Sequence, residues 1–207
     1  MITKPSLATL TVWGPPLALL VLIALLEALR PWVHAELVYQ RSLIQQGEVW
    51  RLLTGNLVHL GLWHAFLNGL GVLVFVLLCP VRWGVLGWGW RLLVLGLGMS
   101  LGLLLWVPSL EGYVGLSGVI HGLFVLGLWP QVRRRDLIAS GCLLYLVGKV
   151  GWELYAGAPV SDEAAIGGRV IVESHLYGSL TAALILIASS GLTRLRHLAD
   201  VRGPSIH

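Results

Sequence analysis

The chain has 207 residues, of which 57% are hydrophobic and only 12% are charged, and its mean hydropathy is +0.82. This composition excludes a water-soluble globule, which needs more polar surface, and indicates a polytopic membrane protein. The net charge of +4 is attributed to membrane orientation rather than to nucleic-acid binding. Cys79 and Cys142 both lie in apolar runs, so we expect buried thiols with neither a disulfide nor a metal role.

Apolar stretches recur along the whole chain and predict an all-α fold. We expect a single membrane domain over residues 1–207 with six transmembrane helices, at about 7–29, 57–79, 92–107, 116–129, 137–155 and 172–190. The first stretch lacks a convincing small-residue cleavage site, so we interpret it as a retained helix. The mixed segment 30–54, with aromatic residues, predicts a structured loop at the membrane interface, and residues 80–91 predict a basic turn.

Basic residues are distributed unequally between the two sides that six helices define. Four lie on one side: Arg30, Arg41, Arg51 and Arg169. Nine lie on the side of both termini: Lys4, Arg82, Arg91, Arg133, Arg134, Arg135, Arg194, Arg196 and Arg202. The positive-inside rule therefore predicts cytoplasmic termini, and Ser117 and His175 then enter the membrane together from the outer side.

Polar groups interrupt two of the apolar stretches. His59, His64 and Asn68 lie in the second one, where hydrocarbon tolerates them only if they face protein or a water-filled cavity. Lys149 and Glu153 in the fifth are spaced i,i+4, so an ion pair between them would lower the cost of burial. We interpret this pair as structural rather than catalytic, and His59 as no more than a packed residue.

The segment from Gly115 to Gly122, Gly-Leu-Ser-Gly-Val-Ile-His-Gly, carries a hydroxyl into the fourth stretch. A serine between glycines at the start of a helix can present its oxygen without a neighbouring Cβ in the way. The geometry suits a nucleophile at Ser117. A Gly/Ser packing surface between helices explains the same residues and stays open on this segment alone.

A serine needs a base to take its proton, and His175 at the start of the sixth stretch can supply one. Close approach of the two helices requires small residues, which Gly118-x-x-x-Gly122 and Gly178-x-x-x-Ala182 provide. His64 and Asn68, at i and i+4 of the second stretch, and the backbone N–H of Ser117 are candidate oxyanion donors. Four polar groups on three helices near the outer side are costly without a function.

These residues together resemble the rhomboid intramembrane serine proteases. The pattern is Trp50-Arg51, Thr54, His59, His64-x-x-x-Asn68, Gly115-x-Ser117-Gly118 and His175-x-x-Gly178, and it covers nearly the whole chain. The resemblance implies a six-helix rhomboid core, a Ser117/His175 dyad without a third acidic member, and His64 and Asn68 in the oxyanion hole. It also implies a structural role for the first outer loop, no cofactor and no metal.

Within that family, the chain is most similar to the rhombosortase branch, which carries Gly-Leu-Ser-Gly-x-x-His-Gly and a Ser-His-Leu-Tyr-Gly segment, here from Ser174 to Gly178. Rhomboids of the general type usually have tyrosine, stacked on the catalytic imidazole, where this chain has His121. His121 lies at i+4 from Ser117 and is open to roles as a competing base or a relay. We favour His175 as the base and His121 as an auxiliary group that orients or polarises it.

The branch also implies a substrate and a location. The expected partners are exported proteins with a C-terminal Gly-Gly motif, a transmembrane helix and a basic tail, cleaved at the outer, periplasmic side of a bacterial inner membrane. A Gly-Gly pair costs roughly 1 kcal/mol per glycine in helix stability, which helps a substrate to unwind. Transfer of the acyl group to an amine instead of water is compatible with the same site.

Three other functions are weighed against proteolysis. A non-catalytic rhomboid-like protein that binds transmembrane helices would not need Ser117, His175, His64 and Asn68 together. A membrane metalloprotein using His59, His64, His121 and His175 lacks the usual closely spaced ligand pair, since His59 and His64 at i,i+5 diverge by about 140° on a helix. A secondary transporter is disfavoured because the sequence contains no convincing internal repeat.

Overall fold

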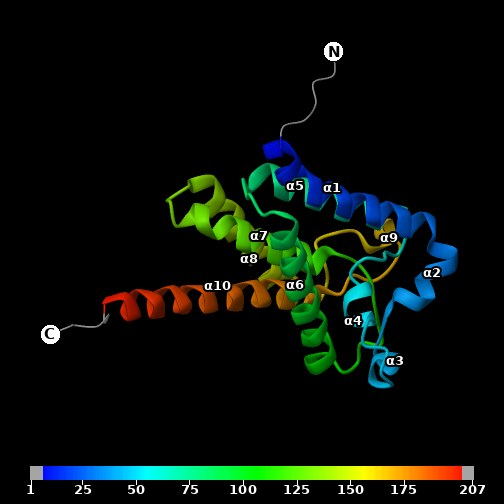
Figure 1. Ribbon diagram of the computed structural model, residues 1–207. Helices are drawn as coiled ribbons and strands as arrows, with labels where there is room; N and C mark the ends of the chain where they lie inside the picture. Colours follow the sequence, from blue (N-terminus) through cyan, green and yellow to red (C-terminus); the bar gives the residue numbers. More distant parts are fainter. Residues whose placement is uncertain (1–6, 202–207) are drawn as a thin grey trace, which may run out of the picture.

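The computed structural model describes residues 7–201, with side chains described for 12–191, and it is mainly helical (Figure 1). The two short strands β1 (Tyr39–Gln40) and β2 (Gly112–Tyr113) are antiparallel, with Tyr39 paired to Tyr113. The helices are α1 (Leu7–Ala28), α2 (Arg30–Leu37), α3 (Arg41–Gln45), α4 (Arg51–Thr54), α5 (Leu62–Leu78), α6 (Val85–Trp106), α7 (Ser117–Val132), α8 (Leu137–Ala156), α9 (Glu163–Ile166) and α10 (Val172–Val201).

Each of the six predicted apolar stretches overlaps one long helix. Among the described residues, α6, α8 and the Val172–Gly191 part of α10 are long and apolar enough to cross a membrane. Val12–Ala28 of α1 passes the same test together with α2, across a bend of 106°. The helices α5 and α7 are apolar but shorter, with 17 and 16 residues. Length and composition therefore identify three to four candidate spans.

The predicted helix bounds are wrong at several ends, most clearly at α6. The expected basic turn over 80–91 stops early, because α6 begins at Val85 rather than at residue 92. Arg91 lies inside the helix, where its guanidinium stacks 4.1 Å from the centre of the Trp83 ring and donates to the carbonyl of Gly87. Local aromatic and backbone partners thus accommodate the charge without ending the helix. At the other ends, α5 begins at Leu62 rather than 57, and α10 continues to Val201.

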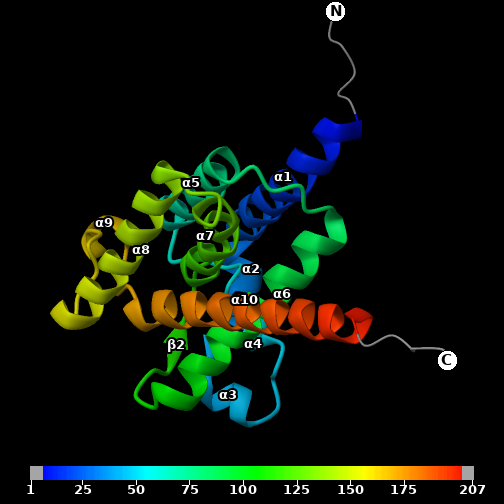
Figure 2. The ribbon, with the colours of Figure 1, turned by 90° about the vertical axis from the view of Figure 1, so that its left-hand side faces the viewer.

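The helix α7 lies at the centre of the molecule and packs against α5, α6, α8 and α10. Figure 2 shows α10 running across α6, and α10 also packs against α7. Val72 and Phe75 of α5, Leu95 of α6, and Val119 and Leu123 of α7 are completely buried in the resulting core. The outer faces carry exposed apolar side chains, as a lipid-facing surface requires.

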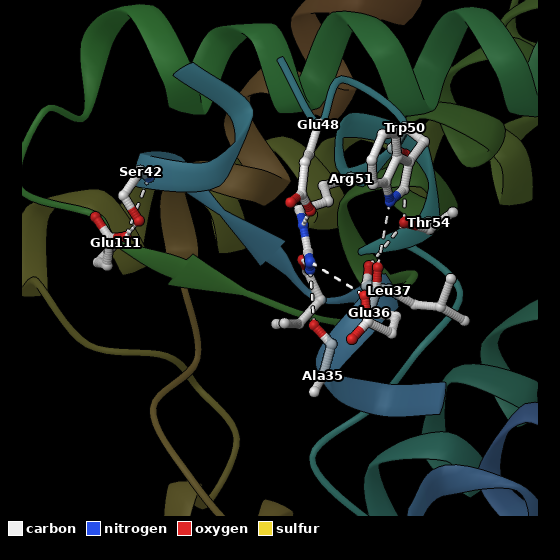
Figure 3. Close-up of polar contacts among 10 residues, drawn as sticks. Ala35, Glu36, Leu37, Ser42, Glu48, Trp50, Arg51, Thr54 and Glu111 are labelled. Carbon is white, nitrogen blue, oxygen red and sulfur yellow. Dashed lines mark hydrogen bonds and ion pairs between the residues drawn. The ribbon is translucent and has the colours of Figure 1, made fainter. Parts of the chain in front are cut away.

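The segment between α1 and α5 is an ordered loop, held by contacts from polar side chains to backbone carbonyls (Figure 3). The Arg51 guanidinium is only 2% exposed; it donates to the carbonyl oxygens of Ala35 and Val38 and pairs with Glu48 at 2.6 Å. Thr54 donates to the carbonyl of Leu37 at 2.7 Å. The predicted structured loop is therefore present, with α2, β1, α3 and α4 inside it.

A second arginine attaches this loop to the end of α6. Arg41 donates from its guanidinium to four carbonyl oxygens at 2.7–2.9 Å, those of Leu103, Leu104, Val107 and Leu110. The last carbonyls of a helix lack intrahelical partners, so a cation at this position satisfies them and complements the helix dipole.

Candidate active site

The turn before α7 requires a glycine at residue 115. Gly115 has φ +119°, in the left-handed region, and a Cβ there would lie 2.7 Å from the His64 ring. The Tyr113 hydroxyl donates to the Gly115 carbonyl at 2.6 Å, and the Gly115 N–H donates to the carbonyl of Gly55. The turn is thereby fixed, and it places Ser117 as the first residue of α7.

The contact between α7 and α10 is close because glycines face each other across it. A Cβ on Gly118 would lie 2.6 Å from the carbonyl of Ser174, and one on Gly122 would lie 2.7 Å from the carbonyl of Gly178. A Cβ on Gly178 would overlap the carbonyl of Gly118. The predicted small-residue contact between these helices is therefore confirmed, and it brings the two backbones together near Ser117.

Ser117 and His175 meet across this contact. The Oγ of Ser117 lies 3.0 Å from Nε2 of His175, and His175 is 4% exposed. The two residues are 58 positions apart in the sequence and come from different helices. The distance lies within the hydrogen-bond reach that a serine nucleophile and an imidazole base require.

His121 packs face to face against His175. Their ring centroids are 4.1 Å apart and the planes differ by 15°. Nδ1 of His121 lies 2.7 Å from the carbonyl oxygen of Ser117. Because a carbonyl only accepts, this nitrogen carries the proton, and Nε2 is left to accept from Lys149 Nζ at 3.3 Å. His121 therefore makes its contacts with the Ser117 backbone and with Lys149, and its ring supports that of His175.

Glu153 contacts the edge of the His175 ring that does not face Ser117. Its Oε2 lies 2.8 Å from Nδ1 of His175, and its Oε1 lies 2.7 Å from Lys149 Nζ. The i,i+4 contact between Lys149 and Glu153 is present as the spacing predicted. The expectation that no acidic group accompanies the Ser117/His175 pair is wrong for this geometry, because a carboxylate touches the second ring nitrogen.

His64 faces the serine turn from α5, whereas Asn68 is turned toward its own helix. Nδ1 of His64 accepts from the N–H of Leu60 at 3.3 Å, so its proton is on Nε2, the nitrogen next to Gly115. One N–H of Asn68 donates to the carbonyl of His64 at 2.9 Å. A carboxamide has two N–H donors, so Asn68 keeps one more. His59 packs edge-on against His64, at 5.1 Å between ring centroids.

Comparison with known proteins identifies the family of this arrangement. Residues 46–190 match the Rhomboid domain family. The chain belongs to the rhomboid family. Over 100 residues it is also 34% identical to a Bacillus subtilis (strain 168) protein named "Putative rhomboid protease YdcA", an alignment that covers 47% of this chain and 49% of that protein. The chain thus spans about half the length of this curated relative.

The family assignment supports the sequence-based resemblance at its coarser level. A rhomboid with apolar helices is a multi-pass membrane protein, and the name of the relative supports a protease. The rhombosortase branch, the residue roles and the substrate stay predictions.

An apolar groove of about 420 Å³ leads from the helix surface to the site. It is lined by residues of α5, α7 and α8, including Val74, Phe124 and Leu146. His121 and Lys149 lie on its wall, so this groove reaches the polar cluster around His175. The groove lies between the second and fifth predicted apolar stretches, with α7 as its third wall.

Glu153 is the residue of this site whose role sequence reasoning missed. Its spacing from Lys149 suggested an ion pair that needed no other partner. The available signal was its position: Glu153 is near the end of α8, and His175 is in the first turn of α10, the next long helix along the chain. When two successive long helices run antiparallel, the end of the first lies near the start of the second, so the carboxylate and the imidazole were candidates for contact.

Proposed function

We propose that this rhomboid is an intramembrane serine endopeptidase in which Ser117 is the nucleophile and His175 the general base. The observation that carries the proposal is the 3.0 Å contact between Ser117 Oγ and His175 Nε2, made between two tightly packed helices. His175 takes the serine proton as Oγ attacks the peptide carbonyl, and then returns a proton to the leaving amine. In the second step His175 takes a proton from a water molecule as that water attacks the acyl-enzyme, and then returns the proton to Ser117 Oγ.

The developing oxyanion is assigned three donors. The backbone N–H of Ser117 lies at the start of α7, where helix N–H groups have no intrahelical acceptor. The Nε2–H of His64 faces the same turn, and the second N–H of Asn68 completes the set after a side-chain rotation toward Ser117. Donors aimed at the oxyanion each contribute about 3 kcal/mol of transition-state stabilisation.

The site is assigned to the outer face of a bacterial plasma membrane, with six spans and both termini in the cytoplasm. The excess of arginine and lysine on the terminal side supports this orientation. Exposed apolar side chains on α1, α5, α6, α8 and α10 support contact of these helices with lipid. In this arrangement Ser117, at the outer end of α7, lies below the level of the outer loop and within reach of water.

The proposed substrates are exported proteins anchored by a C-terminal segment of Gly-Gly, transmembrane helix and basic tail. The Gly-Leu-Ser-Gly-Val-Ile-His-Gly and Ser-His-Leu-Tyr-Gly segments support this rhombosortase-type assignment. A glycine pair lowers helix stability, so the chain beside it can extend across Ser117. The apolar groove between α5 and α8 has a volume of about 420 Å³, which is large enough to admit several apolar side chains of such a helix.

The test is cleavage of a reporter carrying this Gly-Gly, helix and basic-tail segment in membranes that contain the wild type or a variant. Ser117→Ala and His175→Ala are expected to abolish cleavage. Ser140→Ala and His34→Ala are the matched controls, since Ser140 bonds only near the start of α8 and His34 lies on α2. If Ser117→Ala cleaves as well as the wild type, the nucleophile is wrong, and a binding-only or metal-dependent function takes precedence.

A further inference from the structure

Glu153 is a buried carboxylate. A mechanism that uses only Ser117 and His175 does not explain why the protein tolerates the free-energy cost of burying it. It is 1% exposed and lies in α8, a helix apolar enough to cross a membrane. A carboxylate in such a helix is retained where its oxygens are bonded and its position has a function. Both oxygens are bonded here, Oε1 to Lys149 Nζ at 2.7 Å and to the N–H of Val160 at 3.1 Å, and Oε2 to His175 at 2.8 Å.

The contact with His175 fixes which ring nitrogen carries the proton. An ionised carboxylate only accepts hydrogen bonds, so Nδ1 of His175 must be the N–H that donates to Oε2. The proton is then absent from Nε2, and the lone pair of that nitrogen points at Ser117 Oγ, 3.0 Å away. This is the tautomer that can accept the serine proton.

Three contacts fix the orientation of the His175 ring. Glu153 holds one edge of the ring, His121 stacks on its face, and Ser117 meets the other edge. Glu153 in turn is held by Lys149, which also donates to His121. Because the ammonium lies 3.5 Å from His175 Nδ1, its charge opposes that of the carboxylate at the imidazole. Glu153 therefore contributes more by orienting the His175 ring and selecting its tautomer than by its charge.

We propose that Glu153 is a positioning residue that completes a Ser117–His175–Glu153 triad, with Lys149 as the group that holds the carboxylate in place. The proposal rests on the proposed protease function. During attack, the serine proton moves to His175 Nε2, the Nδ1 proton stays on the ring, and Glu153 keeps its charge and accepts from the imidazolium throughout. The leaving amine then receives the Nε2 proton.

The first experiment measures kcat and KM for the Gly-Gly reporter with the wild type and with Ser117→Ala, Glu153→Gln and Glu153→Asp in the full-length protein. Glu153→Gln removes the charge and can donate to Nδ1, which places the proton on the wrong nitrogen. We expect kcat to fall at least about 100-fold with KM within about threefold, as for the loss of the acidic member of other triads. Glu153→Asp keeps a carboxylate and is expected to restore at least a tenth of the wild-type kcat.

Two substitutions separate this role from a general effect of lost charge. Glu36→Gln removes an exposed carboxylate on α2 and is expected to leave kcat unchanged. Lys149→Gln still donates to Glu153 and is expected to lower kcat less than Glu153→Gln does. Equal losses in Lys149→Gln and Glu153→Gln would assign the effect to the ion pair and overturn the triad.

Nitrogen–proton NMR of the histidine rings tests the proposal in the unmodified protein, independently of whether Glu153→Gln folds. The His175 signals, assigned by their loss in His175→Ala, should show the proton on Nδ1. A proton on Nε2, or a wild-type kcat in Glu153→Gln, overturns the triad. The protease function fails separately, if the wild type does not cleave or if Ser117→Ala cleaves equally well.

Discussion

The loop between α1 and α5 and the Ser117 site both hold polar side chains in an apolar protein, but those side chains bond to different partners. In the loop, Arg41, Arg51 and Thr54 donate to backbone carbonyls. At the site, Ser117, His175 and Glu153 bond through their side chains to one another. Groups bonded to the backbone hold a chain in place. Groups bonded to each other can pass a proton and still face a substrate.

The comparison predicts two kinds of variant. Loop variants should lower the free energy of unfolding and leave the rate per folded molecule unchanged. Site variants should lower the rate and leave unfolding unchanged.

Gly178→Ala should have the largest effect, because it lies where the scaffold and the site meet. Its Cβ would overlap the Gly118 carbonyl, and neither helix backbone can yield without moving Ser117 from His175. We expect a loss of more than about 3 kcal/mol in the free energy of unfolding, or no folded protein. Thermal unfolding in detergent measures it. Gly148→Ala is the control, since nothing lies within 4 Å of a Cβ at Gly148; equal stability of the two variants would refute the close contact.

Arg41→Ala should be the most destabilising loop variant. It removes one donor from each of four carbonyls at or just after the end of α6; those of Leu103 and Val107 keep only a backbone N–H donor each. We expect unfolding to become easier by about 3 kcal/mol, with kcat per folded molecule within about threefold of the wild type. Chemical denaturation and reporter kinetics on the same preparation measure both. Arg82→Ala, at an exposed position, should change neither; a large fall in kcat with unchanged stability in Arg41→Ala would contradict the division between the regions.

His121→Ala should lower the rate moderately. It removes the ring that stacks on His175 at 4.1 Å together with the bond to the Ser117 carbonyl. Aromatic pairs contribute about 0.5–1.5 kcal/mol, so we expect kcat to fall by up to about tenfold with an unchanged unfolding temperature. His121→Phe restores a stacking ring and should fall less. Complete loss of activity in His121→Phe, comparable to His175→Ala, would make His121 a base rather than an auxiliary group.

The smallest effect is expected at Glu111, in the loop that precedes α7. Hydrogen bonds from the side chain and the N–H of Ser42 hold the pKa of this carboxyl below its ordinary value of 4.5. A lowered folded-state pKa stabilises the protein above the ordinary value, and that contribution is lost as the pH falls through the folded-state pKa. Glu111→Gln should therefore be less stable than the wild type at neutral pH and equal to it in acid. Unfolding temperatures that differ equally at both pH values would exclude the charged contact with Ser42.

Much of the fold followed from local signals in the sequence. Runs of apolar residues gave the six long helices, and the glycines at 118, 122 and 178 indicated where two of them approach. Helix ends were less predictable. Arg91 was expected to lie in a turn, yet Trp83 and Gly87 provide partners that keep it in α6. Such partners depend on side-chain placement that periodicity does not encode.

The residues of the site also divide into those that the sequence predicted and one that it did not. Ser117 and His175 were predicted to meet from the residue types and their expected depth, and the structure places them in contact. Glu153 was not assigned to the site, because its i,i+4 partner Lys149 already accounted for its charge. The packing of α8 near the start of α10 brings the second oxygen of the carboxylate to His175, a contact that the position of Glu153 allowed but did not require.

The most direct test of the account is covalent labelling of the protein in detergent with a fluorophosphonate, which reacts with serines activated by a base. The account predicts that mass spectrometry finds the label on Ser117 in the wild type, that Ser117→Ala is not labelled, and that His175→Ala is labelled at least about 100-fold more slowly. Labelling of a different serine, or equal labelling of Ser117 in His175→Ala, would contradict the claim that this pair forms the active site.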